Sequence, residues 1–249
     1  MEIPAMCRAY ALHCNGYPVY DESRLFNKKR LLYFDSRMSE DMLIRKAQLD
    51  ERLSGQRGRP LRLLYSGRYE PLKGAVDAVG VARECLKRGL NIEMHCYGQG
   101  SSRSEMRDIA SDSICHGKVH VHGAIPYPEL VEISRGFDVF VCCHIQSDPS
   151  CTYLESFGAG LPIVGYDNRM WRRLREDSLA GLSSPIGDPR SVAENIERLV
   201  SEDGMLVEMS KRARGFAAEH TFQTEFKRRT DDLNAALNTL ESPRLILPK

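Results

Sequence analysis

The segment from Ser147 to Asn168 carries residue types that could bind an anionic ligand. It opens with small polar residues and a proline, which favour the N-cap and first turn of a helix. Gly158 and Gly160 favour the end of that helix, and the apolar residues after them favour a short strand. Because a helix N-terminus presents unpaired N–H groups, the pattern predicts an anion site or, alternatively, a purely structural helix. Glu155 would lie close enough to contact polar groups of the same ligand.

Two basic residues and two glycines follow the first expected strand, in the sequence SGRYEPLKG. Gly67 lets the backbone pass close to a ligand, and Gly74 lies at the start of the next helix. Arg68 can engage two oxygens at once, whereas Lys73 contributes a compact point charge. The loop predicts a clamp for a diphosphate, with a solvated surface loop as the alternative.

A glycine-containing turn with the sequence YGQG, residues 97–100, follows the second expected strand. Gly98 and Gly100 are weak support for a dinucleotide-binding fingerprint, because that fingerprint belongs after the first strand. A simple turn is the better prediction for these residues.

Three histidines lie in or next to expected strands. His120 and His122 flank Val121 and so share one face of a strand, a spacing that could bind a metal ion. The sequence offers no third ligand of matched spacing, and we expect no bound metal. His144 follows an apolar strand, where it either contacts the ligand or is a satisfied loop or core histidine.

The single tryptophan, Trp171, lies among arginines. The arginines are Arg169, Arg172, Arg173 and Arg175. This cluster could contact an anionic acceptor or a membrane surface, but a solvated helix face is the better prediction.

The composition limits the classes of function. The 249-residue chain has 35 basic and 34 acidic residues and a net charge of +1, which argues against nucleic-acid binding through bulk charge. Its eight cysteines show no C-x-x-C spacing, which favours reduced thiols over disulfides or zinc. The sequence has no apolar run of about 18 residues and no signal-peptide pattern, so we expect a cytoplasmic protein.

From Leu61 onward, short apolar runs alternate with amphipathic helical patterns. Strands are expected at Leu61–Ser66, Ile92–Tyr97, Val119–Val121, Asp138–Cys142, Pro162–Gly165 and Leu182–Pro185. Helices are expected near Gly74–Arg88, Ser104–Ala110, Tyr127–Ser134, Thr152–Phe157 and Asn168–Arg175. This alternation predicts an α/β fold, a Rossmann-like doubly wound parallel sheet followed by C-terminal helices. Ligands of such sheets bind at the carboxyl ends of the strands.

The two ends of the chain follow other patterns. Helices are expected from Asp188, from about Gly204 to Glu219 and from Thr221 to about Leu240. The last helix has an apolar stripe, which we expect to pack in the core, with an interface as the alternative; it comprises Phe222, Phe226, Leu233, Leu237 and Leu240. Residues 1–60 lack a βα alternation and contain the glycine-rich linker Ser54–Arg59, so they do not resemble a complete domain.

The order and spacing of these motifs resemble the donor-binding, C-terminal domain of GT-B glycosyltransferases in the large retaining family four, the glycosyl transferases group 1. The resemblance covers about residues 60–220 and rests on SGRYEPLKG, YGQG, HVHGAIPYPEL, FDVFVCCH and LESFGAGLPIVGYDN. It implies a nucleotide-diphosphate-sugar donor, a glycan or lipid-linked acceptor such as a growing polysaccharide, and no cofactor.

The resemblance also implies roles for individual residues. Arg68 and Lys73 would bind the donor diphosphate, and Glu155 would hold the ribose hydroxyl groups. Backbone amides of residues 150–153 would face the phosphate and sugar, and residues 123–125 would lie near the nucleobase. The implied donor-binding set is Gly67, Arg68, Lys73, Gly98, Gly123, Ala124, Ile125, Ser150, Cys151, Thr152, Tyr153 and Glu155.

One departure from the family pattern concerns the donor sugar. Family members commonly place two glutamates eight residues apart, and the first contacts the sugar. Here Ser147 stands eight residues before Glu155, and Asp148 is the nearest acid. The catalytic residues are therefore open: Asp148, Ser147 or main-chain groups could contact the sugar, with His144 as a further candidate, or Asp148 is only an N-cap.

The second departure is length. We expect residues 1–60 to be a remnant of an N-terminal acceptor domain with its linker, residues 61–218 the donor-binding domain, and residues 219–249 a C-terminal crossing helix and tail. The chain would then be a fragment, a truncated product or one subunit of a split enzyme, and its partner chain would carry the acceptor domain. Nucleic acid is not an expected partner, and membrane contact would be peripheral at most.

The sequence leaves two alternative classes of function. One is a non-catalytic fragment or subunit that binds a nucleotide-sugar. The other is a dinucleotide-dependent oxidoreductase, which is disfavoured because SGRYEPLKG stands where a G-x-G-x-x-G turn belongs.

Overall fold

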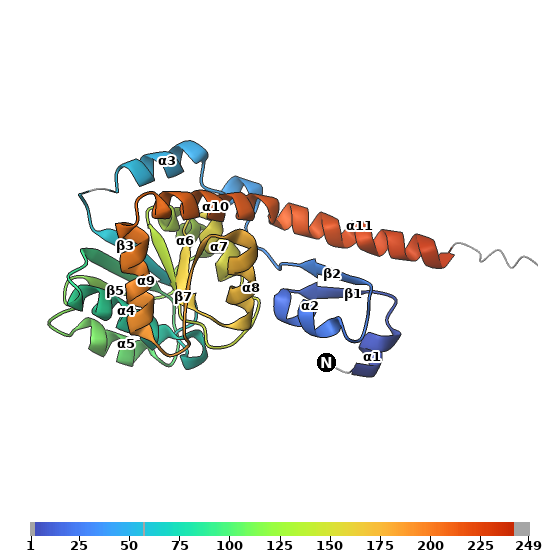
Figure 1. Ribbon diagram of the computed structural model, residues 1–249, viewed down its shortest axis with the longest axis horizontal. Coiled ribbons are helices and arrows are strands. Elements are labelled where there is room, and N and C mark those ends of the chain that lie inside the picture. The colour runs from blue at the N-terminus through green and yellow to red at the C-terminus, as the bar shows by residue number, and fades with distance from the viewer. Residues whose placement is uncertain (1–2, 57, 242–249) are drawn as a thin grey trace, which may run out of the picture.

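The computed structural model describes residues 3–56 and 58–241. The chain forms a six-stranded sheet with helices on both faces (Figure 1). Residues near the N-terminus form a two-stranded sheet beside it. Within the described ranges, no helix has the length and apolar character needed to cross a membrane.

The large sheet is parallel throughout and contains the six expected strands. Their bounds are β3 Leu61–Ser66, β4 Ile92–Tyr97, β5 Val119–Val121, β6 Val139–Cys142, β7 Ile163–Tyr166 and β8 Gly181–Ser184. The strand order is β5-β4-β3-β6-β7-β8, and each neighbouring pair runs in the same direction. The predicted Rossmann-like α/β fold is confirmed. Because the strand order reverses between β3 and β6, a crevice for ligand is expected at the carboxyl ends of these two strands.

Helices cover the two faces of the large sheet. They are α4 Ala75–Lys87, α5 Arg103–Ala110, α6 Tyr127–Ser134, α7 Thr152–Gly158, α8 Arg169–Ser178, α9 Pro189–Ser201 and α10 Met205–Glu219, with a short 3-10 helix η2 Pro71–Lys73 before α4. Leu63 and Val141 pack with side chains of α4, α5 and α9, whereas Phe140 and Ile163 pack with side chains of α7, α8 and α10. This alternation follows from the period of two along a strand.

Helix α8 is longer than predicted, since we expected it to end at Arg175. The helix continues to Ser178 and ends where Leu179 adopts a left-handed conformation, with φ of 52°. Glycine is the usual residue at this position, so a leucine there gave no stop signal.

The prediction that residues 1–60 lack a βα alternation is wrong. The elements are α1 Ile3–Arg8, β1 Leu12–Asn15, α2 Tyr17–Ser23, β2 Arg30–Tyr33, the 3-10 helix η1 Glu40–Met42 and α3 Lys46–Ser54. Strands β1 and β2 pair in parallel around α2. Each strand has four residues and mostly half-buried side chains, so neither a continuous apolar run nor a clear alternation marked them in the sequence.

The C-terminal helix α11, Phe222–Glu241, extends away from the large sheet and packs against β2 (Figure 1). Glu225 accepts a hydrogen bond from the Phe34 amide at 3.1 Å, and Arg228 donates to the Leu32 carbonyl at 3.2 Å. The predicted core role of the apolar stripe is wrong, because its described side chains are exposed: Phe222, Phe226, Leu233 and Leu237. The side chain of Leu240 lies outside the described residues.

A buried ion pair ties the linker before β3 to the start of β6. Asp138 is fully buried and accepts two hydrogen bonds from the Arg59 guanidinium, at 2.7 and 2.8 Å. The Arg62 amide donates a third bond to the same carboxylate at 2.9 Å. These contacts fix the entry of β3 beside β6, the pair between which the strand order reverses.

Replacing Asp138 by Ala should lower the free energy of unfolding by about 3 kcal/mol, because the Arg59 guanidinium and the Arg62 amide both lose the buried carboxylate to which they donate. Urea denaturation of both proteins measures the change. The control is Glu197→Ala, which breaks an exposed pair with Arg88 and should cost less than about 1 kcal/mol. Equal losses in the two variants would contradict a special role for the buried pair.

Candidate functional site

The loops that follow β3, β4 and β5 enclose a cavity of about 260 Å³ at the predicted edge of the sheet. The cavity contains five members of the predicted donor-binding set. Its lining residues are Gly67, Arg68, Tyr97, Gly98, Gln99, Ala124, Ile125 and Leu130. Gly123 adjoins it, and its carbonyl accepts a hydrogen bond from the Gly98 amide at 3.3 Å.

Two glycines allow the loops of this site to pack backbone against backbone. A Cβ at Gly98 would lie 1.9 Å from the Gly67 carbonyl oxygen. Gly74 has φ of 59°, and a Cβ there would lie 1.9 Å from the carbonyl oxygen of Cys143. Any larger residue at Gly74 would therefore force the loop after β3 away from the end of β6.

Lys73 is not the free cation that the sequence predicts. Its side chain is only 8% exposed, and its Nζ donates to Oδ2 of Asp148 at 2.6 Å. Burial opposes ionisation of Asp148, but the hydrogen bond and charge of Lys73 outweigh it, so the pKa of Asp148 lies below its ordinary value. The Ile145 amide also donates to the Leu72 carbonyl at 3.1 Å. The loops after β3 and β6 are thus joined by an ion pair and a backbone bond.

His144 lies at the end of β6 with its side chain buried. Burial, together with the charge of Lys73, lowers its pKa to about 3, so the imidazole is neutral at pH 7. Its ring packs edge-on against Tyr153 with a centroid distance of 5.7 Å. Among the described residues, His144 Nδ1 and Asp148 Oδ1 are buried atoms without a hydrogen-bond partner. Two unsatisfied polar atoms therefore lie in the vicinity of Lys73.

The polar residues before α7 do not cap this helix as the sequence predicts. The N-cap is Cys151, which makes no side-chain capping bond. Ser147 Oγ instead accepts from the Arg169 amide at 3.1 Å, and Ser150 Oγ bonds to Thr152 Oγ1 at 2.9 Å. The hydroxyl of Ser147 thus binds the first residue of α8, and Asp148 binds Lys73.

The backbone amides at the start of α7 are only partly available to a ligand. Those of Ser150 and Tyr153 already donate to the carbonyls of Asp148 and Ser150, at 2.9 and 3.4 Å. Of the four predicted amides, Cys151 and Thr152 are those for which the described residues show no acceptor.

Glu155 is buried and pairs with a residue that the sequence motifs missed. Arg37 Nε and Nη2 donate to Oε1 of Glu155 at 2.9 and 2.6 Å. Burial raises the pKa of Glu155 by more than the charge and hydrogen bonds of Arg37 lower it. Arg37 also lies over the Tyr127 ring, 4.5 Å from its centroid. Arg37 comes from residues 1–60, outside the region of the motifs, so no local signal pointed to it.

Glu155 lies next to the cavity rather than in its wall. It lines a small hollow of about 10 Å³ together with Ser66 and Tyr127, and Leu130 borders both the hollow and the cavity. The structure therefore brings the predicted ribose ligand beside Arg68 and the predicted base residues, whereas Lys73 does not line the cavity.

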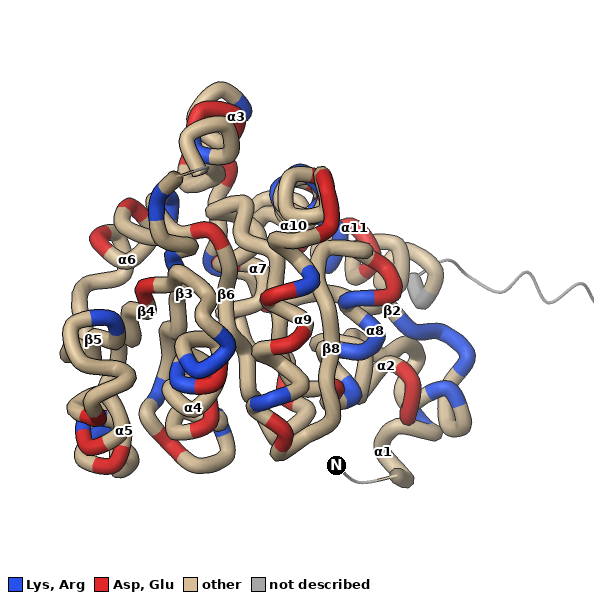
Figure 2. The backbone as a smooth tube through the Cα atoms, turned by 60° about the vertical axis from the view of Figure 1, so that its left-hand side comes forward, with Lys and Arg blue, Asp and Glu red and all other residues tan. Residues whose placement is uncertain are grey.

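The tryptophan and its neighbouring arginines are structural. Trp171 is fully buried, and its indole N–H donates to the Leu182 carbonyl at 3.3 Å. Arg169 pairs with Glu22 at 2.6 Å, and Arg172 with Asp167 at 2.7 Å. Figure 2 shows basic and acidic residues interspersed along the helices. The predicted solvated face is formed by these arginines without Trp171.

Comparison with known proteins gives matches along most of the chain. It is 24% identical over 186 residues to an α-D-kanosaminyltransferase of Streptomyces kanamyceticus, covering 74% of this chain and 48% of that protein. It is 25% identical over 143 residues to a phosphatidyl-myo-inositol mannosyltransferase of Mycolicibacterium smegmatis, covering 57% of this chain and 36% of that protein. The chain thus spans about half or less of the length of these curated relatives.

The fold is similar to that of solved glycosyltransferase structures. The structure of Anabaena HepE in complex with UDP and glucose superposes with a TM-score of 0.74 at 12% identity, covering 93% of this chain and 65% of that one. At this identity the similarity shows a shared fold. The family model described as glycosyl transferases group 1 matches residues 48–216, more than half of the chain. The chain therefore belongs to the family of glycosyl transferases group 1.

Proposed function

We propose that this chain binds a nucleoside-diphosphate sugar at the carboxyl ends of β3 to β6 and supplies the donor half of a glycosyltransferase. The observation that carries the proposal is the cavity at the carboxyl ends of β3, β4 and β5, which gathers Gly67, Arg68, Gly98, Ala124 and Ile125 of the predicted donor-binding set. Ligands of open parallel sheets bind at this edge, beside the point where the strand order reverses.

The diphosphate would lie between Arg68, Lys73 and the start of α7. Arg68 is exposed on the wall of the cavity, where its guanidinium can engage two phosphate oxygens. As the bond to the sugar breaks, negative charge grows on the leaving diphosphate. Cations and amides already fixed in place stabilise that charge without reorganisation.

The nucleoside would extend from the diphosphate toward the loop after β5. The cavity wall at Ala124 and Ile125 is apolar and suits one face of a base, with Glu155 beside it for the ribose hydroxyl groups. The UDP in the HepE structure supports a nucleoside diphosphate as the ligand class and makes UDP a suitable probe.

The sugar would lie near Asp148 and His144, in place of the glutamate that the family commonly has there. Asp148 is ionised and held by Lys73, so it can accept hydrogen bonds from sugar hydroxyl groups. His144 is neutral and acts as a hydrogen-bonding group rather than a cation. The acceptor hydroxyl would attack from the front face, and the sugar would be transferred with retention of its configuration.

The acceptor would be a glycan or a lipid-linked molecule, bound with the help of a further domain or partner chain. The name of one relative, a phosphatidyl-myo-inositol mannosyltransferase, supports a lipid acceptor, whereas the name kanosaminyltransferase states only the sugar that is transferred. The N-terminal elements α1 to β2 and helix α11 would contact that domain, as the exposed apolar stripe of α11 supports. The same stripe favours the second candidate, a non-catalytic donor-binding subunit. Turnover of a nucleotide-sugar by the isolated chain would exclude this second candidate.

Replacing both cations, in Arg68→Ala with Lys73→Met, should weaken UDP binding by at least about 100-fold, because hydrogen bonds between charged partners contribute about 1.5–3 kcal/mol each. Titration calorimetry measures the affinity, and circular dichroism checks the fold. The matched control is Arg88→Ala, which removes a cation on the far surface of α4–α9. If the folded double variant binds UDP as wild type does, the diphosphate site is elsewhere.

Replacing Glu155 by Gln should weaken UDP binding by about tenfold, because the ribose hydroxyl groups lose a charged acceptor. The specific readout is UDP against its 2′,3′-dideoxy analogue. Wild type should prefer UDP, and the variant should bind the two alike. Arg37→Ala is the companion variant, which removes the partner of Glu155 and leaves its carboxylate. A preference for UDP that survives in Glu155→Gln would refute the ribose contact.

Acid should destabilise the protein through His144. The unfolded imidazole binds a proton near pH 6.5, whereas the folded one does so only near pH 3. Between these values the unfolded state binds more protons, so stability falls as the pH falls. By about pH 5 the loss should reach about 2 kcal/mol relative to neutral pH, and His144→Gln should lack this component. Urea denaturation at several pH values measures it, and parallel pH curves for the two proteins would contradict the buried neutral imidazole.

A further inference from the structure

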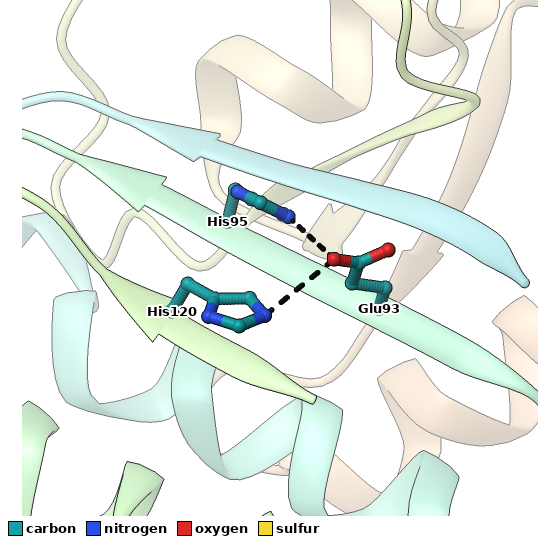
Figure 3. A group of neighbouring side chains, drawn as sticks. All are labelled: Glu93, His95 and His120. Carbon is teal, nitrogen blue, oxygen red and sulfur yellow. Dashed lines mark hydrogen bonds and ion pairs between the residues drawn. The ribbon is translucent and has the colours of Figure 1, made fainter. Parts of the chain in front are cut away.

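Three potential metal ligands on adjacent strands lie together (Figure 3), and none of them lines the donor cavity described above. Glu93 and His95 come from β4, and His120 comes from β5. The parallel register places His95 directly opposite His120, and Glu93 lies two residues before His95 on the same face of β4. The sequence spacing paired His120 with His122 and gave no third ligand. The structure instead brings Glu93 and His95 to His120 from the neighbouring strand β4, which spacing along one strand does not reveal.

The distances within this cluster fit a tetrahedral zinc ion. One carboxylate oxygen, Oε1 of Glu93, lies 3.0 Å from His95 Nε2 and 3.5 Å from His120 Nε2. Zinc bonds to nitrogen and oxygen of about 2.0–2.1 Å require ligand atoms about 3.3 Å apart in a tetrahedron. The ligand atoms of the three residues all lie within 4.8 Å of one another, so the two histidine nitrogens would approach one another on binding if they start near this limit.

A hydrogen bond to His122 would orient the ring of the proposed ligand His95. His95 Nδ1 lies 3.0 Å from His122 Nε2. With zinc on Nε2, the proton of His95 would reside on Nδ1 and be donated to His122. A metal-bound histidine usually donates its other N–H in this way, which fixes its ring orientation. His122 is in turn stacked on Tyr97, with ring centroids 4.5 Å apart.

The charges and exposure of the cluster suit a bound cation. The three side chains are between 23% and 35% exposed, so an ion and a water molecule can reach them. Glu93 supplies a carboxylate beside two imidazoles, and its Oε1 lies within 3.5 Å of a ring nitrogen of each histidine. A basic residue also lies beside the carboxylate: Arg62 of β3 pairs in register with Glu93.

We propose that Glu93, His95 and His120 form a zinc site on the open face of β4 and β5, with water as the fourth ligand. Two imidazole nitrogens and one carboxylate are a donor set that zinc accepts in proteins. None of the three residues lines the donor cavity, so the proposed metal ligands are distinct from the proposed donor-binding residues. Tyr97, which does line the cavity, connects it to the cluster through His122.

Titration calorimetry of the metal-stripped chain with ZnCl₂ should show one site per chain. Because the free thiol of Cys7 is exposed and can bind zinc, the experiment uses a Cys7→Ser background. His120→Gln and His95→Gln should each weaken zinc binding by at least about 100-fold, and His122→Phe, which keeps a ring against Tyr97, by about tenfold. His116→Gln is the matched control, since His116 is exposed and outside the cluster.

Cobalt(II) provides a second readout that identifies the ligands. The protein should give the intense visible absorption of four-coordinate cobalt without a thiolate-to-metal charge-transfer band, and His120→Gln should lose it. Three results would overturn the proposal. The first is no zinc binding by the folded protein at about 100 μM, a concentration that saturates structural and catalytic zinc sites. The second is equal zinc affinity in His120→Gln and His116→Gln. The third is a thiolate band that persists in both variants, which would assign the metal to cysteines.

Discussion

The contact between the loop after β3 and the loop after β6 is the constraint on which the candidate site depends. Gly74 in a left-handed conformation lets the first loop lie against the Cys143 backbone. The ion pair of Lys73 with Asp148 then joins side chains that arrive from opposite sides of the strand-order reversal. Because both loops begin at carboxyl ends of adjacent parallel strands, the sheet topology determines where the site forms, and the side chains determine its chemistry.

The strands of the large sheet could be predicted because the sequence marks both their interiors and their ends. Leu61–Ser66 is mostly apolar, Ile92–Tyr97 alternates apolar with polar residues, and these ranges coincide with β3 and β4. Elements without such marks were missed, namely the short strands β1 and β2 and the last turn of α8 before Leu179. The apolar periodicity of α11 correctly predicts a helix, but a periodicity alone does not predict whether the apolar face of that helix is buried.

The candidate site was predictable in position but not in its internal pairing. Residues at strand ends, such as Gly67, Arg68 and Ala124, line one cavity because the parallel topology gathers strand ends. The bonds of Lys73 with Asp148 and of Arg37 with Glu155 link residues 75 and 118 positions apart. Such pairs have no local pattern, and neither does the approach of Glu93 and His95 to His120, which depends on strand register.

These pairings bear on how a donor would bind, because both carboxylates of the site already hold a cation. A ribose at Glu155 competes with Arg37, but the Arg37 side chain is 57% exposed and can return to water at little cost. Lys73 differs, since its buried ammonium would lose a partner at a desolvated site if Asp148 moved away. We therefore expect Lys73 to remain paired while it contacts phosphate, so that exposed Arg68 supplies the larger share of the attraction for the diphosphate.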